Sequence, residues 1–356
     1  MNYYISIIFR AIPLLMGAFT FFFGLYVQQF EAVQPLARPA AIILLSLTAI
    51  CVALYATAAT IIRQLIRSYT TLAKWCLPII GYIGAGIAIF YGAHLFLANP
   101  TVAPDIVAGD VCFGVGLVAA CVSTVATAST KFSQIPRNYQ RTPGIRNKDG
   151  FKSMTACHIM EAIPAIAFFI AFSRGVYLLA TGTTQAAYIA GHVEIGLSMI
   201  CASLIMLVAT VVRQIQNVFD RTHRPWTGAY IVLTCGAIAI LWGLGVLLNL
   251  PFGGAVAPGY VMIGLGLICW SISSKVILLI LAWHHESEYA SRIPMIPIFT
   301  CLLCLFVSSF LFQNVLVNSS YYIPAHVLSG LGAVCFTLFS IVSILESGTS
   351  VDVSKL

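Results

Sequence analysis

Long hydrophobic runs alternate with short polar stretches along almost the whole chain. A run of about 20 apolar residues is long enough to cross the ~30 Å hydrocarbon core of a bilayer as an α-helix. The pattern therefore predicts an all-α, polytopic membrane protein. We expect ten transmembrane helices, near residues 5–28, 39–62, 75–98, 104–129, 153–180, 187–212, 227–250, 256–282, 294–317 and 323–345.

The composition agrees with this pattern, because 60% of the residues are hydrophobic and only 8% are charged. An ordinary soluble domain has roughly 25% charged residues. Few residues remain outside the predicted helices, so residues 1–356 form a single membrane domain. Any function must therefore be located in or at the bilayer.

A short pattern recurs in every second predicted helix. It is seen best as Gly191-His192-Val193, followed by Gly196 and Cys201. We number its variable second residue as position 0, and the members are Ile42, Asp110, His192, Tyr260 and His326. Their regular separation indicates a tandem repeat. The repeat units span about residues 1–68, 69–133, 150–216, 224–284 and 290–346.

Each unit is a hairpin of two helices, so all the units cross the membrane in the same orientation. Like-oriented hairpins differ from the inverted repeats of many secondary transporters. They can close into a pseudo-fivefold ring around a cavity lined by the even-numbered helices. An open arc, or a bundle with helices at its centre, is equally compatible with the sequence.

Small residues recur four positions after position 0 on the same helical stripe. They are Ser46, Gly114, Gly196, Gly264 and Gly330. Small side chains allow membrane helices to approach closely, so this stripe predicts a packing seam. Position +8 is β-branched in all five copies, which predicts either an apolar collar or contact with a neighbouring helix.

Ionisable residues in a membrane are costly and often mark functional or paired sites. At position 0 we expect Asp110, His192, Tyr260 and His326 to lie at one level, one to two turns below the periplasmic surface, as a candidate pore or proton-sensing ring. The alternative for each is a bond to a helix end or to interfacial water. Glu194 lies on another helix face and is a further candidate.

Three other charged residues fall within hydrophobic runs. Glu161 and Lys275 lie at similar depths in the cytoplasmic half and form a candidate ion pair. Alternatively, both side chains extend to the interface, as long charged side chains commonly do. We expect the same of Arg174 near the other surface.

Basic residues indicate the orientation. They concentrate in alternate loops, above all in the loop of residues 130–152, whereas Arg38 is the single basic residue in the loops of the other side. The positive-inside rule then places both termini in the cytoplasm. Contact with anionic membrane lipids accounts for the net charge of +7 without a nucleic-acid partner.

The chain contains no phosphate-binding glycine loop, no zinc-protease motif and no nucleophile elbow. The eleven cysteines lie mostly in hydrophobic runs, where thiols act as small apolar residues. We therefore expect no enzymatic activity, no catalytic residues, no metal and no cofactor.

Two stretches of the last unit carry a family resemblance. Residues 292–302 (RIPMIPIFTCL) and 330–340 (GLGAVCFTLFS), with the segments around Gly109 and Gly191, resemble the YhiM-like family of enterobacterial inner-membrane proteins. The likeness covers the whole chain. It implies an inner-membrane location and an association with survival in acid, and it supplies no catalytic or binding residues.

The sequence thus favours a channel-like or transporter-like protein of acid stress that senses protons or conducts a proton or a small solute. The alternative is a membrane sensor, lipid-binding protein or scaffold that transports nothing and acts through its basic cytoplasmic loop.

Overall fold

The structure, a computed structural model, describes residues 3–66, 71–99, 101–133, 154–216, 226–249, 255–284 and 287–349. Within these ranges the chain is helical, without strands, and ten helices are long and apolar enough to cross a membrane. They are α1 (Tyr3–Gln28), α2 (Ala37–Ile66), α3 (Thr71–Ala98), α4 (Ala103–Ser133), α7 (Met154–Thr181), α8 (Gln185–Gln216), α9 (Thr227–Asn249), α10 (Ala257–His284), α12 (Met295–Asn314) and α13 (Tyr322–Thr349). The predicted all-α membrane architecture is confirmed. Two short elements, α11 (Ser287–Ala290) and the 3-10 helix η2 (Ser319–Tyr321), complete the described structure.

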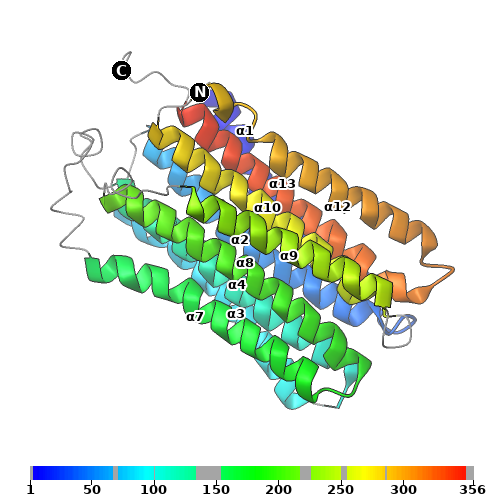
Figure 1. Ribbon diagram of the computed structural model, residues 1–356. Helices are drawn as coiled ribbons and strands as arrows, with labels where there is room; N and C mark the ends of the chain where they lie inside the picture. Colours follow the sequence, from blue (N-terminus) through cyan, green and yellow to red (C-terminus); the bar gives the residue numbers. More distant parts are fainter. Residues whose placement is uncertain are drawn as a thin grey trace.

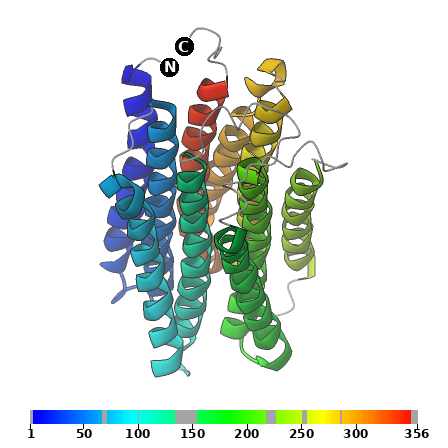
Figure 2. The ribbon, with the colours of Figure 1, turned by 90° about the vertical axis from the view of Figure 1, so that its left-hand side faces the viewer.

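Consecutive helices pair into five hairpins, as the repeat predicts: α1 with α2, α3 with α4, α7 with α8, α9 with α10 and α12 with α13. Helix α1 begins and α13 ends at the same end of the bundle, which we call the terminal end (Figures 1 and 2). The opposite end, where each hairpin turns, is the hairpin end. Most of the predicted cytoplasmic loop, residues 130–152, lies outside the described residues.

The second helices of the hairpins form a closed ring. Helix α2 packs against α4, α4 against α8, α8 against α10, α10 against α13, and α13 returns to α2. We call these the core helices. Between 72% and 89% of the residues in each of their spans are buried, compared with 22% to 33% for the first helices of the hairpins. The ring, one of three arrangements that the sequence allowed, is therefore the one adopted.

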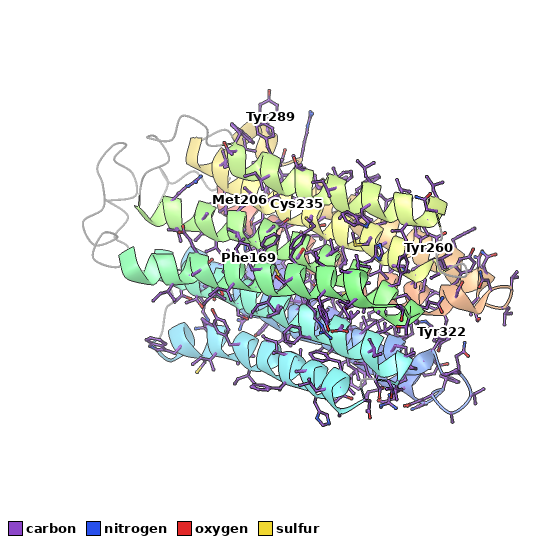
Figure 3. All side chains as sticks on the ribbon, turned by 60° about the horizontal axis from the view of Figure 1, so that its bottom comes forward. Phe169, Met206, Cys235, Tyr260, Tyr289 and Tyr322 are labelled. Atoms are coloured by element: carbon purple, nitrogen blue, oxygen red, sulfur yellow. The ribbon has the colours of Figure 1, made fainter. Side chains whose placement is uncertain are left out.

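The first helices, α1, α3, α7, α9 and α12, surround this ring, and we call them rim helices. Each rim helix packs against the core helix of its own hairpin and against the core helix of the preceding unit. Large apolar side chains cover their outward faces, among them Phe22, Phe90, Phe169, Leu241 and Phe306. Figure 3 shows side chains projecting from the bundle along its length, including Phe169. A bilayer, not water, is the solvent that suits such a surface.

The predicted small-residue seam joins adjacent core helices. A Cβ atom added to Gly330 would lie 2.6 Å from Leu47 Cδ1 and 3.0 Å from Leu44 Cδ2. In the same way, the residues at positions +2 and +5 of the next unit pack against Gly114, Gly196 and Gly264. Ser46 occupies this position in the first unit, and its hydroxyl donates to the Ile43 carbonyl at 2.7 Å. One packing rule therefore operates around the ring.

A second set of glycines lets each rim helix approach its own core helix. A Cβ atom on Gly92 would lie 2.6 Å from the Gly109 carbonyl oxygen, and one on Gly175 would lie 2.9 Å from that of Gly191. In the last unit Ser308 takes the glycine's place, and its hydroxyl donates to the Ala325 carbonyl at 2.7 Å. The hairpins are thus held by direct backbone contact.

Helix α9 offers a matched test of this contact. A Cβ atom on Gly243 would lie 2.6 Å from the Gly259 carbonyl oxygen, whereas one on Gly245 would have no atom within 4 Å. We expect Gly243→Ala to lower the free energy of unfolding by about 1–3 kcal/mol, because the backbones must separate. Gly245→Ala should cost nothing. Thermal unfolding of both variants in detergent checks this, and equal midpoints would contradict it.

Candidate functional site

The position 0 residues lie away from the ring axis, and Ile42, Asp110, His192 and His326 each meet the rim helix of the next unit. Phe23 of α1 stacks on His326 with ring centroids 5.4 Å apart, and the Trp242 and His192 ring centroids are 6.3 Å apart. Arg174 occupies the equivalent place over Asp110. Phe23, Arg174 and Trp242 each directly precede a rim-helix glycine. This geometry corrects the prediction that the position 0 residues face a central pore.

The two histidines have nearly the same surroundings. His192 Nδ1 lies 2.8 Å from the Tyr188 carbonyl oxygen, and His326 Nδ1 lies 2.7 Å from that of Tyr322. A carbonyl oxygen only accepts hydrogen bonds, so Nδ1 carries the proton in both rings. The preceding tyrosine ring lies 4.3 Å away in each case. Both imidazoles therefore fill aromatic clefts near the hairpin end.

Two other copies at position 0, Tyr260 and Ile42, are not ionic. Tyr260 is half-buried and its ring meets that of Tyr321 edge-on, with centroids 6.3 Å apart. Ile42 is buried in a small apolar cluster with Ala88 and Leu95 of α3. Figure 3 places Tyr260 at the hairpin end of the bundle, on the same level as Tyr322. The five copies therefore share a position but not a chemistry.

Asp110 is the charged member of this set and is held by Arg174. Its carboxylate is fully buried, and Oδ1 accepts a hydrogen bond from Arg174 Nε at 2.8 Å. The guanidinium lies 4.6 Å from the centroid of the Phe96 ring, a cation–π contact. The other carboxylate oxygen of Asp110 has no hydrogen-bond partner among the described residues. Sequence reasoning placed Arg174 at the interface and missed this inward pairing.

Glu194 enters the same interface from α8. It is the position +2 residue of its unit, where the other copies have Leu44, Cys112, Met262 and Leu328. Its side chain is fully buried over Gly114 of α4, where an added Cβ atom would lie 2.6 Å from Oε1 and 2.8 Å from Oε2. Neither oxygen has a hydrogen-bond partner among the described residues. A carboxylate thus occupies a packing position that is otherwise apolar.

Asp110, Glu194 and Arg174 together form what we call the carboxylate site. Glu194 lies over Gly114, one helical turn after Asp110 on α4, and Arg174 is bonded to Asp110, so the three charged groups share one interface. With both carboxyl groups ionised the site carries a net charge of −1. Burial of an uncompensated charge in a membrane protein costs several kcal/mol. Three unpartnered carboxylate oxygens and one excess negative charge suit the binding of a single proton.

A second charged group lies nearer the hairpin end. Arg38 Nε is 2.8 Å from Asp105 Oδ1, and Arg38 also donates to Glu31 at 3.2 Å. Asn99 donates to the second oxygen of Asp105 at 2.9 Å. Asp105 is thus buried with one oxygen in an ion pair and the other hydrogen-bonded, although Oδ1 accepts no hydrogen bond of good geometry. Glu194 has neither kind of partner among the described residues.

The axis of the ring is apolar and narrow. The cavity there has room of about 30 Å³ for water-sized molecules, enough for about one water. It is lined at position +8 by Ile50, Val118, Ile200, Ile268 and Val334, and at position +12 by Leu54, Val122, Leu204, Ile272 and Leu338. The β-branched residues at position +8 therefore form the predicted collar.

Position +15 brings Lys275 to this axis, together with Thr57, Val125 and Leu207. Glu161 lies on the rim helix α7, which packs against α4 and α8, whereas Lys275 lies on α10. The predicted Glu161–Lys275 ion pair is therefore wrong. The two residues share a depth in the sequence pattern, but the ring places their helices apart.

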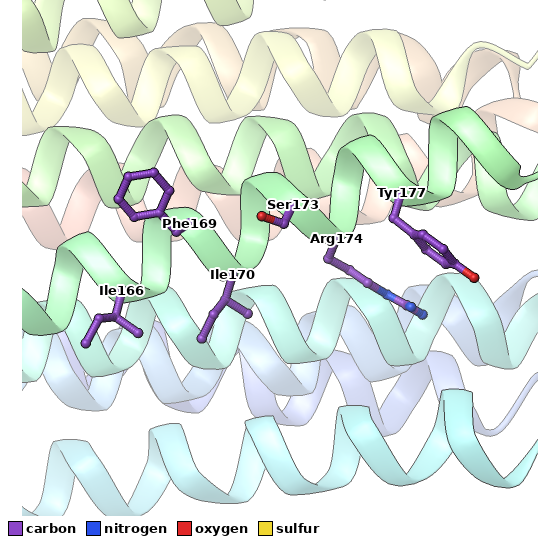
Figure 4. A pocket seen from close by; sticks show the side chains of 6 residues that line it. All are labelled: Ile166, Phe169, Ile170, Ser173, Arg174 and Tyr177. Atoms are coloured by element: carbon purple, nitrogen blue, oxygen red, sulfur yellow. The ribbon is translucent and has the colours of Figure 1, made fainter.

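A shallow groove of about 650 Å³ runs along the outward face of α7. Its lining is Ile166, Phe169, Ile170, Ser173, Arg174 and Tyr177 (Figure 4). The groove brings the partly exposed side of the Arg174 guanidinium to the surface that faces lipid. Arg174 thus connects the buried carboxylate site with the outward face of α7.

Comparison with known proteins places the chain in a family. A family model described as "Protein of unknown function (DUF2776)" matches residues 1–350. The chain belongs to this family. It is also 44% identical over 350 residues to "Inner membrane protein YhiM" of Escherichia coli (strain K12), which covers 98% of this chain and 99% of that protein. No solved structure matches the chain.

These comparisons confirm the resemblance inferred from the sequence. Together with the apolar helices, they establish a multi-pass inner-membrane protein.

Proposed function

We propose that the protein is a proton-responsive, channel-like or transporter-like inner-membrane protein of acid-stress survival. The burial of two carboxylates, Asp110 and Glu194, at one helix interface with a single arginine carries this proposal. A proton bound there would bring the net charge of the site from −1 to zero. Because the site lies between α4 and α8, neutralisation would change how tightly these core helices pack.

The orientation fits this role. By the positive-inside rule, we propose that both termini are cytoplasmic and that the hairpin end faces the periplasm. Asp110 follows the first residue of α4 by seven positions, about 10 Å along the helix. The site would then lie within reach of periplasmic protons. His192 and His326, at a similar depth, are further groups that titrate near pH 6.5 when unperturbed.

We expect reconstituted protein to pass protons or a small solute at a rate that rises as the external pH falls. Asp110→Asn and Glu194→Gln should each remove most of that acid stimulation, because neither amide can take up the proton. Proteoliposomes loaded with a pH-sensitive dye measure the proton flux directly. Radiolabelled solutes extend the assay to other cargo.

Asp105→Asn is the matched control, because Asp105 is a buried carboxylate at the same end that is already paired with Arg38. It should keep the acid stimulation. Absence of flux at every pH between about 4 and 7.5, the range spanning carboxylate and histidine titration, would overturn the transport part of the proposal.

A second candidate function is that of a sensor, lipid-binding protein or scaffold that transports nothing. The apolar axis, with room for about one water, favours it. In that case deletion within the basic loop of residues 130–152 should abolish survival in acid, and the carboxylate-site variants should not. The two functions therefore predict opposite results for the same pair of variants.

A further inference from the structure

The axial cavity contains an isolated ammonium group. Lys275 is 3% exposed and lines the cavity that the five core helices enclose. None of the ion pairs among the described residues involves its Nζ atom. A lysine ammonium has three donors and no acceptor. To keep its proton in an apolar interior, such a group requires an acceptor or a negative charge beside it.

The side chains that line the cavity offer no negative charge, and a single hydroxyl is the one acceptor among them. Val125 and Leu207 lie at the same level of the axis, and the levels above are aliphatic. That hydroxyl belongs to Thr57, which donates to the Ala53 carbonyl of its own helix at 3.1 Å. Its oxygen keeps lone pairs that can accept, but a neutral hydroxyl supplies no compensating charge. The buried carboxylates Asp110 and Glu194 lie near position 0, whereas Lys275 is at position +15, about 22 Å further along the helices.

We propose that this cavity is a binding site for a small inorganic anion of the size of chloride, held by the Lys275 ammonium. The room of about 30 Å³, enough for about one water, selects a single small ion over phosphate or a carboxylic acid. Rings of Lys or Arg are a common device for anion selectivity in membrane pores. Here one lysine on the axis of a five-helix ring supplies that charge.

This site is independent of the carboxylate site, both in position and in chemistry. The proton proposal concerns negative groups between α4, α7 and α8, and the anion proposal concerns one positive group on the ring axis. A result against one therefore leaves the other standing.

Thermal unfolding of the purified full-length protein tests the anion site. Sodium chloride should raise the midpoint saturably above that in sodium gluconate of equal ionic strength. At a chloride concentration tenfold above its Kd the rise should be about 3 °C. Bromide should act like chloride. An identical midpoint in chloride and gluconate would overturn the proposal.

Two variants identify the residue responsible. Lys275→Met should fold well, because it replaces an unpaired buried charge by an apolar chain of similar length, and it should lose the chloride effect. Glu194→Gln, which changes a buried charged group away from the axial cavity, should keep the effect. A chloride response retained in Lys275→Met would show that the anion binds elsewhere.

Crystals of the wild-type protein grown in bromide provide a readout that needs no variant. An anomalous peak beside Lys275 Nζ is the expected result. A well-ordered axis without such a peak would overturn the proposal.

Discussion

Replacement of Arg174 by methionine should lower the free energy of unfolding by about 3 kcal/mol at neutral pH, the cost of breaking a buried ion pair. Arg174 donates to Asp110 at 2.8 Å and is a charged neighbour of Glu194. Without the guanidinium, two carboxylates remain in one apolar interface with no positive charge between them. Thermal and denaturant unfolding in detergent micelles measure the loss.

The same variant should recover stability as the pH is lowered toward about 5, because protons then neutralise the carboxylates that the arginine no longer compensates. The double variant Arg174→Met with Asp110→Asn should recover much of the stability at neutral pH as well. These two recoveries distinguish a charge effect from lost packing of the arginine stem. A deficit that is constant across pH and persists in the double variant would contradict the electrostatic account.

Replacement of Glu194 by leucine should have the opposite sign and raise the free energy of unfolding by about 2 kcal/mol. The reason is that a buried ionic group is often less stable than an apolar residue of similar volume. The repeat itself indicates that leucine fits, because Leu44 and Leu328 occupy this position in other units. Leu44 packs on the seam glycine Gly330 as Glu194 packs on Gly114. Thermal unfolding at neutral pH measures the gain.

Met262→Leu is the matched control, because Met262 occupies position +2 of the fourth unit and packs on Gly196. This volume-conserving exchange should change stability by less than about 1.5 kcal/mol. A Glu194→Leu protein that is less stable than the wild type would mean that the carboxylate is satisfied in the folded protein. That outcome would also remove the reason to regard Glu194 as a proton acceptor.

The two predictions describe one uneven ring. Three of the clefts between core and rim helices are apolar or aromatic. Aromatic rings fill those around His192 and His326, and aliphatic side chains fill the one around Ile42. The cleft between α4 and α7 holds an arginine on a buried carboxylate instead. A destabilised interface kept at one place in an otherwise regular ring is what a functional site requires.

The repeat contains a signal for this site in the sequence itself. Aligning rim helices on their glycines places Arg174 in register with Phe23, Tyr91 and Trp242. The last unit has Val307 at this position, before Ser308. An arginine at a position that is otherwise aromatic or aliphatic signals an inward partner, not an extended interfacial side chain. In the same way, Glu194 stands in register with apolar residues of the other core helices.

The sequence by itself determined that the chain resides in a bilayer, how many helices it forms, how they pair and where the small-residue seam lies. Each of these depends on local properties: run length, spacing along one helix and loop length. Hydrophobic runs of sufficient length have no alternative to helices in a bilayer, because every backbone polar group must be paired internally.

Only the tertiary structure decided which way each repeated position faces. Position 0 and position +8 lie on different faces of the same core helix. The close contact at position +4 fixes the rotation of each core helix, so that position 0 faces the rim helices and position +8 faces the axis. That rotation moved Asp110 and the histidines out of the supposed pore, and it placed Lys275 on the axis away from Glu161. The orientation of a helix about its own axis depends on all its neighbours at once, and spacing within one chain segment does not specify it.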